Sequence, residues 1–197
     1  MIEYPIKTKE QLKEILKIEF SVYIPVTNYR KHSFRYSKSY SIFCALKAFR
    51  EYEYFRNHLV TWKGWLSRKY YSMKLLLLDR KRNILCEKAG IELTPGQIGP
   101  GIRICHANVV IFGKIGEGCV FHGNNVVGNK RTGALNEVPR LGNHVDVGFG
   151  ACIIGNVEIA DNCVIGAGAV VTKSFLVPGT IIAGVPAKII GQVDNNG

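Results

Sequence analysis

The sequence predicts a mainly β protein with an α-helical N-terminal part, in which the β portion is a parallel β-helix. Three observations favour this fold class. Aliphatic residues recur every six positions in the second half of the chain, glycine is concentrated in that half, and aromatic and basic residues are concentrated in the first. A short, strict period of this kind indicates brief strands joined by tight turns and stacked into coils.

Composition divides the chain near residue 90. Residues 1–90 contain 19 Lys and Arg against 8 Asp and Glu, whereas residues 91–197 contain 7 of each, so the net charge of +11 belongs to the first part. Of the glycines, 2 precede this point and 19 follow it, while 16 aromatic residues precede it and 4 follow. We therefore expect a helical N-terminal domain at 1–90, a β-helical domain at 91–192 and a C-terminal tail at 193–197.

The N-terminal part contains three stretches with helical character. Thr8 to Phe20 begins with a Thr-x-x-Gln capping-box pattern and continues with apolar residues at nearly helical spacing. Ser41 to His58 and Trp62 to Asp79 are two further expected helices, and Gly90 is the expected stop signal. The basic side chains of this part form either a solvated face of the helices or a surface for an anionic partner, such as a membrane or an anionic glycan. Nucleic acid is not expected, because no recognition motif accompanies the charge.

The sequence also bears on location. No apolar run is long enough to cross a membrane, and the first residues do not show the pattern of a secretory signal. The six cysteines follow no CxxC or zinc-finger spacing. We expect reduced thiols in a cytoplasmic protein, with peripheral membrane contact through the basic part as the alternative location.

The six-residue repeat begins at Ile98. We expect three hexapeptides to form one triangular coil, with the aliphatic residue of each pointing inward and small residues at the corners. Cys119 and Cys163 occupy positions where small packing residues are usual. The residues expected to point inward are Ile98, Ile104, Val110, Ile115, Phe121, Val127, Leu141, Val147, Ile153, Ile159, Ile165, Val171, Val177 and Ala183.

One insertion interrupts the repeat. Val127 and Leu141 are fourteen positions apart, eight more than one repeat, so the segment within 129–140 is expected to leave the coil as an exposed loop. Loops of this kind on a rigid scaffold often carry function.

The chain from about Ile84 to Gln192 resembles the left-handed β-helix acyltransferases, specifically the serine acetyltransferase-like group. The matching segments are IGPGIRICH at 98–106, VIGAGAVVT at 164–172 and AGVPAKII at 183–190. The basic lead-in before them is similar to members found in bacterial surface-polysaccharide pathways. The resemblance implies an O-acetyltransferase that uses acetyl-CoA, works as a homotrimer or a dimer of trimers, and needs no metal.

The resemblance implies that His106 is the catalytic residue, because the family's histidine follows a turn of the IGPG type. A neutral imidazole can take the proton of an acceptor hydroxyl as that hydroxyl attacks the thioester. The family's acid, which orients the imidazole, matches the place of Glu92, one residue closer to the histidine than usual.

Three departures from the family pattern concern the acceptor. Cys105 stands where serine acetyltransferases have an acid, and Glu137 and Val138 stand where they have Arg-His. Because these residues would hold the amine and carboxylate of serine, we expect the acceptor to be a sugar hydroxyl of a bacterial surface polysaccharide or its precursor, with serine as the alternative. The candidate acceptor-binding residues are Cys105, His122, Lys130 and Arg131, and His122 is expected about one strand spacing, roughly 5 Å, from the His106 segment.

The resemblance also implies where acetyl-CoA binds. In this fold the pantetheine arm lies in a groove between two subunits and contacts mainly backbone. The candidate cofactor-binding residues are Gly128, Asn129, Gly148, Phe149, Gly166 and Ala167, with Lys173 and Lys188 for the phosphates.

Two other functions compete with acetyl transfer. One is a metal-dependent carbonic anhydrase of the same fold, which would need three converging histidines. His106 and His122 could meet, but His144 is expected on a different face. The other is a non-catalytic scaffold in which the β-helix only assembles trimers, and the motif around His106 argues against it.

Overall fold

The computed structural model describes residues 6–24, 37–59, 64–131 and 137–193. The chain divides into two compact units, the first ending at Gly90 and the second beginning at Ile91. Each unit has its own buried core.

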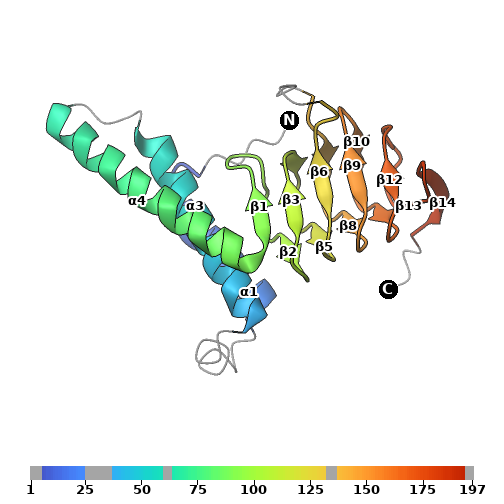
Figure 1. Cartoon of the computed structure of the whole chain (residues 1–197), viewed down its shortest axis with the longest axis horizontal. Coiled ribbons are helices and arrows are strands. Elements are labelled where there is room, and N and C mark those ends of the chain that lie inside the picture. Colours follow the sequence, from blue (N-terminus) through green and yellow to red (C-terminus); the bar gives the residue numbers. More distant parts are fainter. Residues whose placement is uncertain (1–5, 25–36, 60–63, 132–136, 194–197) are drawn as a thin grey trace. The chain divides into compact units, whose positions relative to one another are not determined.

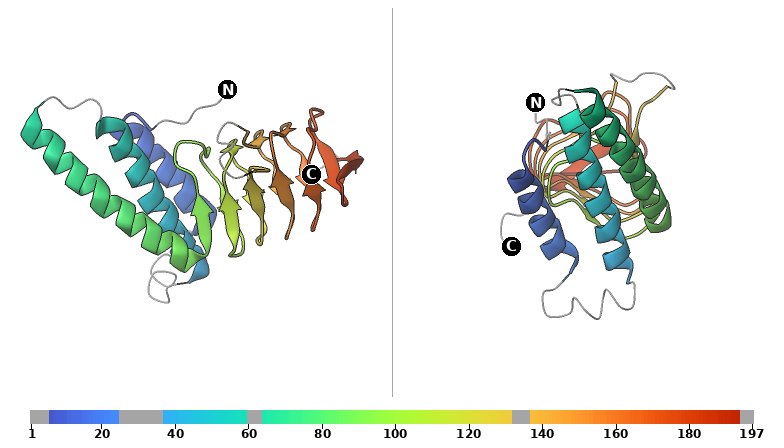
Figure 2. Two further views of the ribbon diagram at one scale, coloured as in Figure 1. Left: turned by 45° about the horizontal axis from the view of Figure 1, so that its top comes forward. Right: turned by 90° about the vertical axis from the view of Figure 1, so that its left-hand side faces the viewer.

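Within the described residues, the first unit contains the helices α1 (Lys9–Tyr23), α3 (Lys38–Leu59) and α4 (Trp65–Ala89), and α3 packs against both of the others (Figure 2). The predicted capping box is confirmed. The Thr8 hydroxyl accepts a hydrogen bond from the Gln11 N–H at 3.1 Å, and the Gln11 side-chain oxygen accepts one from the Thr8 N–H at 3.1 Å. These bonds satisfy backbone donors that the first helical turn leaves without partners.

Helix α4 is ten residues longer at its C-terminus than the expected stretch, which stopped at Asp79. The basic residues that follow do not break the helix. Asp79 and Arg82 instead form an i,i+3 ion pair at 2.7 Å, an arrangement that supports a helix. Gly90 ends α4 in the left-handed conformation, with φ 69° and ψ 40°, and its N–H donates to the carbonyls of Cys86 and Glu87.

A buried ionic cluster joins α1 to α3. The Arg50 guanidinium donates to Glu19 at 2.7 and 2.8 Å and to Glu53 at 3.0 Å, and all three side chains are almost completely buried. Burial raises the pKa of the Glu19 carboxyl, and the positive charge of Arg50 offsets part of this rise. One guanidinium therefore compensates the charge of both carboxylates.

The second unit is a β-helix whose strands form three sheets. Each strand pairs with the equivalent strand of the next coil (Figure 1). All pairs are parallel except β13 with β14, which close the last coil as an antiparallel pair. The five-stranded sheet contains β1 (Ile91–Leu93), β3 (Val109–Ile111), β6 (Val126–Gly128), β9 (Cys152–Ile154) and β12 (Val170–Val171). The three-stranded sheet contains β4 (Lys114–Ile115), β7 (Arg140–Leu141) and β10 (Glu158–Ile159). The six-stranded sheet contains β2 (Arg103–Ile104), β5 (Val120–Phe121), β8 (Asp146–Val147), β11 (Val164–Ile165), β13 (Thr180–Ala183) and β14 (Lys188–Gln192).

Most residues expected to point inward do so, but three do not. Val110 is 36% exposed and Val177 is 52% exposed, and Ala183 is half-buried. The turn that contains His106 is one residue longer than the repeat predicts, so Ile111 is the residue that aligns with Val127. Near the C-terminus the spacing changes in the opposite direction, since the buried residues are Phe175, two positions before Val177, and Ile182, one position before Ala183. Cys119 and Cys163 are buried as expected, and burial raises the pKa of Cys119 to about 11.

The insertion starts and ends as the repeat predicts, between Gly128 at the end of β6 and Arg140 at the start of β7. Residues 132–136 lie outside the described residues. Lys130, Arg131 and Glu137 are exposed, whereas Val138 and Pro139 are already buried against the coil.

We expect Arg50→Ala to lower the free energy of unfolding of the helical unit by about 3–5 kcal/mol, because it removes the guanidinium that pairs with the buried carboxylates of Glu19 and Glu53. Chemical denaturation followed by the helical circular dichroism signal measures this loss. Lys81→Ala is the matched control, since it removes an exposed ion pair with Glu51 and is expected to cost about 0–1 kcal/mol. Equal losses in the two variants would contradict the assigned role of the cluster.

Candidate functional site

His106 lies on an exposed turn between β2 and β3, at the corner where the six-stranded sheet passes into the five-stranded sheet. Asn108 shapes this turn with a positive φ of 62°, and its side-chain amide donates to the Asn124 side-chain oxygen on the next coil at 2.9 Å. The next coil therefore fixes the position of the turn that carries His106.

Gly123 makes room for His106 on that next coil. A Cβ at Gly123 would lie 2.5 Å from the Cβ of His106, and its φ of +121° is one that side chains rarely adopt. Without a side chain at this place, the His106 ring faces Phe149 of the following coil. The two ring centroids are 6.4 Å apart and the planes cross at 76°, an edge-to-face arrangement.

A second histidine lies beside this corner. The register confirms that Ile104 pairs with Phe121, so His122 follows its strand as Cys105 follows the strand of the preceding coil. His122 Nε2 lies 2.9 Å from an oxygen of Asp146, the first residue of β8, and both side chains are a little over two-fifths exposed. Within the described residues, this is the one carboxylate paired with an imidazole.

Sequence reasoning missed both Gly123 and Asp146. Each could have been found by counting residues, because Val147 pairs with Phe121 and Asp146 therefore lies diagonally next to His122. The insertion between β6 and β7 separates Asp146 from His122 in the sequence and hides this proximity.

Glu92 lies on the outer face of β1, opposite Val110 of β3. In the part of the chain that the structure describes, neither Glu92 nor His106 has a side-chain hydrogen bond or ion pair. The orientation of His106 by Glu92 therefore stays a prediction.

The other candidate residues fall at two different corners of the coil. Gly148, Phe149, Gly166 and Ala167 share the corner of His106, and Lys188 pairs with Ala183 at the end of the same column. By contrast, Gly128 ends β6, Asn129, Lys130 and Arg131 follow it, and Lys173 follows β12, at the far end of the five-stranded sheet. A single copy of the chain does not bring these two groups together, and their roles stay predictions.

On the coils that follow Phe149, the corner of His106 carries mostly small residues. A Cβ at Gly148 would lie 2.6 Å from the Ala167 nitrogen, and one at Gly166 would lie 3.0 Å from the Ala183 Cβ. The close stacking of the coils requires these glycines. It also leaves a surface on which an extended ligand could contact the backbone.

One of the residues that led us to expect a sugar acceptor, Val138, has a structural role. Val138 is 4% exposed and packs in the coil, so its side chain does not face an acceptor. The backbone N–H of Cys105 donates to the Phe121 carbonyl at 2.8 Å, and its side chain is half-buried. The identity of Val138 therefore says little about which acceptor binds.

Among the residues that the structure describes, no group of three or more His, Cys, Asp or Glu could hold a metal ion. His144, the third histidine considered for a metal site, lies at another corner, with its ring over Gly118. No described helix is long and apolar enough to cross a membrane.

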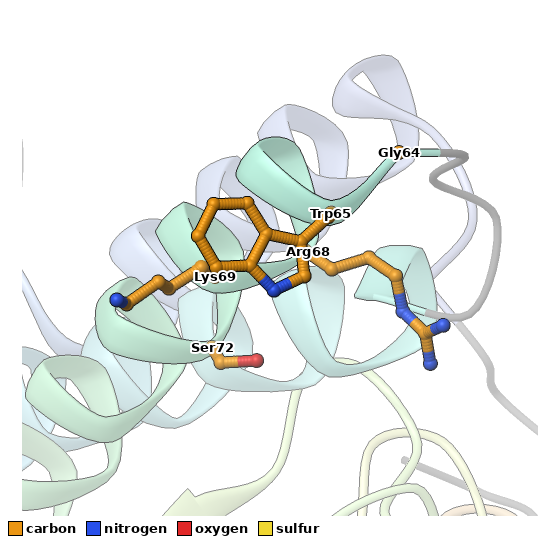
Figure 3. A pocket seen from close by; sticks show the side chains of 5 residues that line it. All are labelled: Gly64, Trp65, Arg68, Lys69 and Ser72. Atoms are coloured by element: carbon orange, nitrogen blue, oxygen red, sulfur yellow. The ribbon is translucent and has the colours of Figure 1, made fainter.

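Helix α4 exposes a mixed apolar and basic surface around a shallow pocket lined by Gly64, Trp65, Arg68, Lys69 and Ser72 (Figure 3). The Lys69 ammonium lies 5.4 Å from the centre of the Trp65 ring, and Trp65 and Leu66 are both largely exposed. An anionic membrane or glycan as the partner of this basic part stays a prediction, and none of the comparisons with known proteins supports it.

Comparison with curated proteins finds serine acetyltransferases. The mitochondrial serine acetyltransferase 3 of Arabidopsis thaliana is 32% identical over 145 residues, which are 68% of this chain and 37% of that protein. The serine acetyltransferase of Buchnera aphidicola subsp. Schizaphis graminum is 30% identical over 159 residues, which are 77% of this chain and 56% of that protein. The chain thus spans about half the length of these relatives or less. No protein-family model matches it.

Solved structures agree on the fold. The serine acetyltransferase of Neisseria gonorrhoeae matches with a TM-score of 0.66 at 21% identity, covering 94% of this chain and 68% of that one. The serine acetyltransferase of Brucella abortus in complex with coenzyme A matches with a TM-score of 0.58 at 22% identity, covering 94% and 70%. The fold is therefore a left-handed parallel β-helix with an α-helical N-terminal part, as predicted.

The relatives support the serine acetyltransferase hexapeptide-repeat family for this chain, and none supports an association with polysaccharide pathways. The prediction of a sugar acceptor is wrong. Relatives at about 30% identity carry the name serine acetyltransferase, which favours the alternative that we had placed second.

We expect Gly123→Ala to displace His106, because the new Cβ would overlap the His106 Cβ at a backbone φ that alanine avoids. The melting temperature should fall, and the NMR resonance of the His106 Hε1 proton should shift. Gly168→Ala is the matched control, since Gly168 also has a positive φ, of +66°, but has no atom within 4 Å of an added Cβ. An unmoved His106 resonance in Gly123→Ala would contradict the packing described above.

Proposed function

We propose that this chain is an acetyl-CoA-dependent serine O-acetyltransferase in which His106 is the general base. The observation that carries the proposal is the exposed corner of a left-handed β-helix where His106 and Phe149 meet across Gly123, in a chain similar to serine acetyltransferases. The activity, the substrates and the partners are part of the proposal, because the chain covers only part of its curated relatives.

The reaction needs a base because a serine hydroxyl is a poor nucleophile near neutral pH. His106 accepts the hydroxyl proton while the oxygen attacks the thioester carbonyl, and a tetrahedral intermediate forms. Collapse of this intermediate breaks the C–S bond, and the thiolate of coenzyme A leaves and takes up a proton. The products are O-acetylserine and coenzyme A. We keep Glu92 as the second proposed catalytic residue on the family resemblance alone.

The structure supports a place for acetyl-CoA along the column that follows His106. Gly148 and Gly166 leave the backbone accessible there, Phe149 supplies an apolar edge, and Lys188 lies at the end of the column. We propose that the pantetheine arm follows this column and that Lys188 contacts a phosphate. The candidates at the other corner, which include Gly128 and Lys173, would then contact the cofactor of a neighbouring subunit.

The assay is coenzyme A release by the purified full chain, with serine and a panel of sugars as acceptors. We expect release with serine above that with any sugar. His106→Ala should lower the serine-dependent rate by about 10²–10⁴-fold, the usual loss when a general base is removed. His144→Asn is the matched control, because His144 lies at another corner with a φ of 54°, which asparagine tolerates.

Two outcomes would contradict the proposal. One is a wild-type chain with no serine-dependent release. The other is a His106→Ala variant that is folded by circular dichroism and keeps most of the wild-type rate.

We also propose that the chain forms a homotrimer through the outer face of the five-stranded sheet. Val110, Val126, Cys152 and Val170 follow one another in register on that face, and the first two are more than a third exposed. A continuous apolar stripe of this kind favours association with another copy.

The six cysteines of the chain are all free, which supports our prediction of a reducing, cytoplasmic location.

Light scattering tests the assembly. We expect a mass three times that of the 21.9 kDa chain, and Val126→Glu should dissociate the assembly because it places a charge in the apolar stripe. The matched control is Val185→Glu, an exposed residue outside this sheet, which should leave the mass unchanged. A wild-type monomer at micromolar concentration would contradict the proposal.

A further inference from the structure

The pair formed by His122 and Asp146 has no part in the mechanism proposed so far, although it lies at the same corner. His122 precedes Gly123, whose absent side chain accommodates His106. Cys105, which precedes His106, has its backbone bonded to the residue before His122. His106 and His122 therefore lie on adjacent coils, with Gly123 packed against His106 and the backbone of Cys105 bonded to Phe121.

The two imidazoles differ in what holds them. His122 Nε2 is 2.9 Å from Asp146, and the backbone N–H of His122 donates to the Val147 carbonyl at 3.0 Å. Among the described residues, the His106 ring has its edge-to-face contact with Phe149 and no side-chain hydrogen bond or ion pair. A carboxylate beside one imidazole nitrogen forms an ion pair with the imidazolium and leaves the other nitrogen to exchange a proton. His122 has this arrangement, with Nδ1 as its remaining nitrogen.

The surroundings favour a functional interpretation of the pair. Asp146 and His122 point outward from the six-stranded sheet, and the outward positions flanking Asp146 on the neighbouring strands are Val120 and Val164. The pair is half-exposed, so it contributes little to folding stability as an ion pair. A half-exposed imidazole next to a proposed base is, however, accessible to a bound substrate.

We propose that His122, oriented by Asp146, is the proton donor to the departing thiolate, while His106 accepts the proton of the acceptor hydroxyl. This inference rests on the proposed acetyl transfer. In the first half of the reaction the serine hydroxyl proton moves to His106 and the new C–O bond forms. In the second half the C–S bond breaks, its electron pair stays on sulfur, and the proton on Nδ1 of the His122 imidazolium moves to that sulfur. His106 then loses its proton to solvent and His122 regains one, so both return to their starting states.

Asp146 acts through His122 and is a positioning residue in this scheme. Its carboxylate lies 2.9 Å from Nε2 and forms an ion pair with the imidazolium, so that Nδ1 carries the transferable proton. The scheme assigns the acid and base steps to different imidazoles, so the variants of each should respond differently to the chemistry of the leaving group.

The experiment compares two acetyl donors on the purified full chain with serine as acceptor. One donor is acetyl-CoA, whose alkyl thiol leaves poorly without a proton. The other is an S-aryl thioacetate, whose thiolate is stable enough to leave unprotonated. With acetyl-CoA we expect His122→Ala to lose about 10²–10⁴-fold in rate, as for the loss of a general acid. With the aryl donor, the rate loss caused by His122→Ala should be at least about tenfold smaller. The rate loss caused by His106→Ala should be the same with both donors.

Asp146→Asn should show the same donor dependence as His122→Ala with a smaller loss, and it should change the basic limb of the pH–rate profile, which reports the group that must be protonated. Glu158→Gln is the matched control, since Glu158 is an exposed carboxylate on the three-stranded sheet with no imidazole partner among the described residues. His122→Gln provides a second variant if His122→Ala fails to fold.

The results separate this inference from the proposed function. A wild-type chain without serine acetylation would overturn the proposed function itself. An active wild type with a His122→Ala variant that loses nothing, or loses equally with both donors, would overturn the role of His122. A donor-dependent loss in His106→Ala would assign the proton donor to His106 and overturn the inference as well.

Discussion

The close parallel stacking of the coils is the constraint on which the second unit depends. Each strand of the β-helix pairs with the equivalent strand one coil later. Residues at equivalent places of successive coils therefore form columns, and neighbours within a column are about 5 Å apart. Inward columns form the core, as with Ile104, Phe121 and Val147, which follow one another on the six-stranded sheet. Outward columns bring together residues that are far apart in the sequence.

The candidate site follows from this stacking. A column can hold a large side chain only if its neighbours leave room, and at the corner of His106 the next coil supplies Gly123. Phe149, one coil further on, can then approach the imidazole, and the diagonal step from His122 to Asp146 forms the imidazole–carboxylate pair. Small residues continue the column beyond Phe149 and leave backbone exposed. In the trimer that we propose, a second copy of the chain would supply the opposite wall, so the site needs no deep cavity.

Much of the fold could be predicted from the sequence because its determinants are local. The six-residue period identifies the coil, the Thr8 and Gln11 pattern marks the start of α1, and Gly90 marks the end of α4. The register of Ile104 with Phe121 also follows from counting. The errors arise where a turn is longer or shorter than the repeat predicts. The longer turn at His106 turns Val110 outward, and no local pattern signals that extra residue.

The site was less predictable than the fold. His106 follows from its motif, but Asp146 becomes a neighbour of His122 only through pairing across an insertion. The acceptor prediction failed for a related reason. It assumed that Glu137 and Val138 face a ligand because their relatives' counterparts do, whereas Val138 is buried in the coil that receives the end of the insertion. Single positions near an insertion are therefore weak indicators of substrate, and the overall similarity to serine acetyltransferases was the better guide.

The central claim is that acetyl transfer takes place at the corner of His106. A crystal structure of the full chain with bound coenzyme A tests it most directly. We predict that the coenzyme A sulfur lies within hydrogen-bond reach of the His106 or His122 imidazole and that the pantetheine arm follows the column of Gly148 and Gly166. A cofactor bound with its sulfur at another corner of the coil, away from both histidines, would contradict the account.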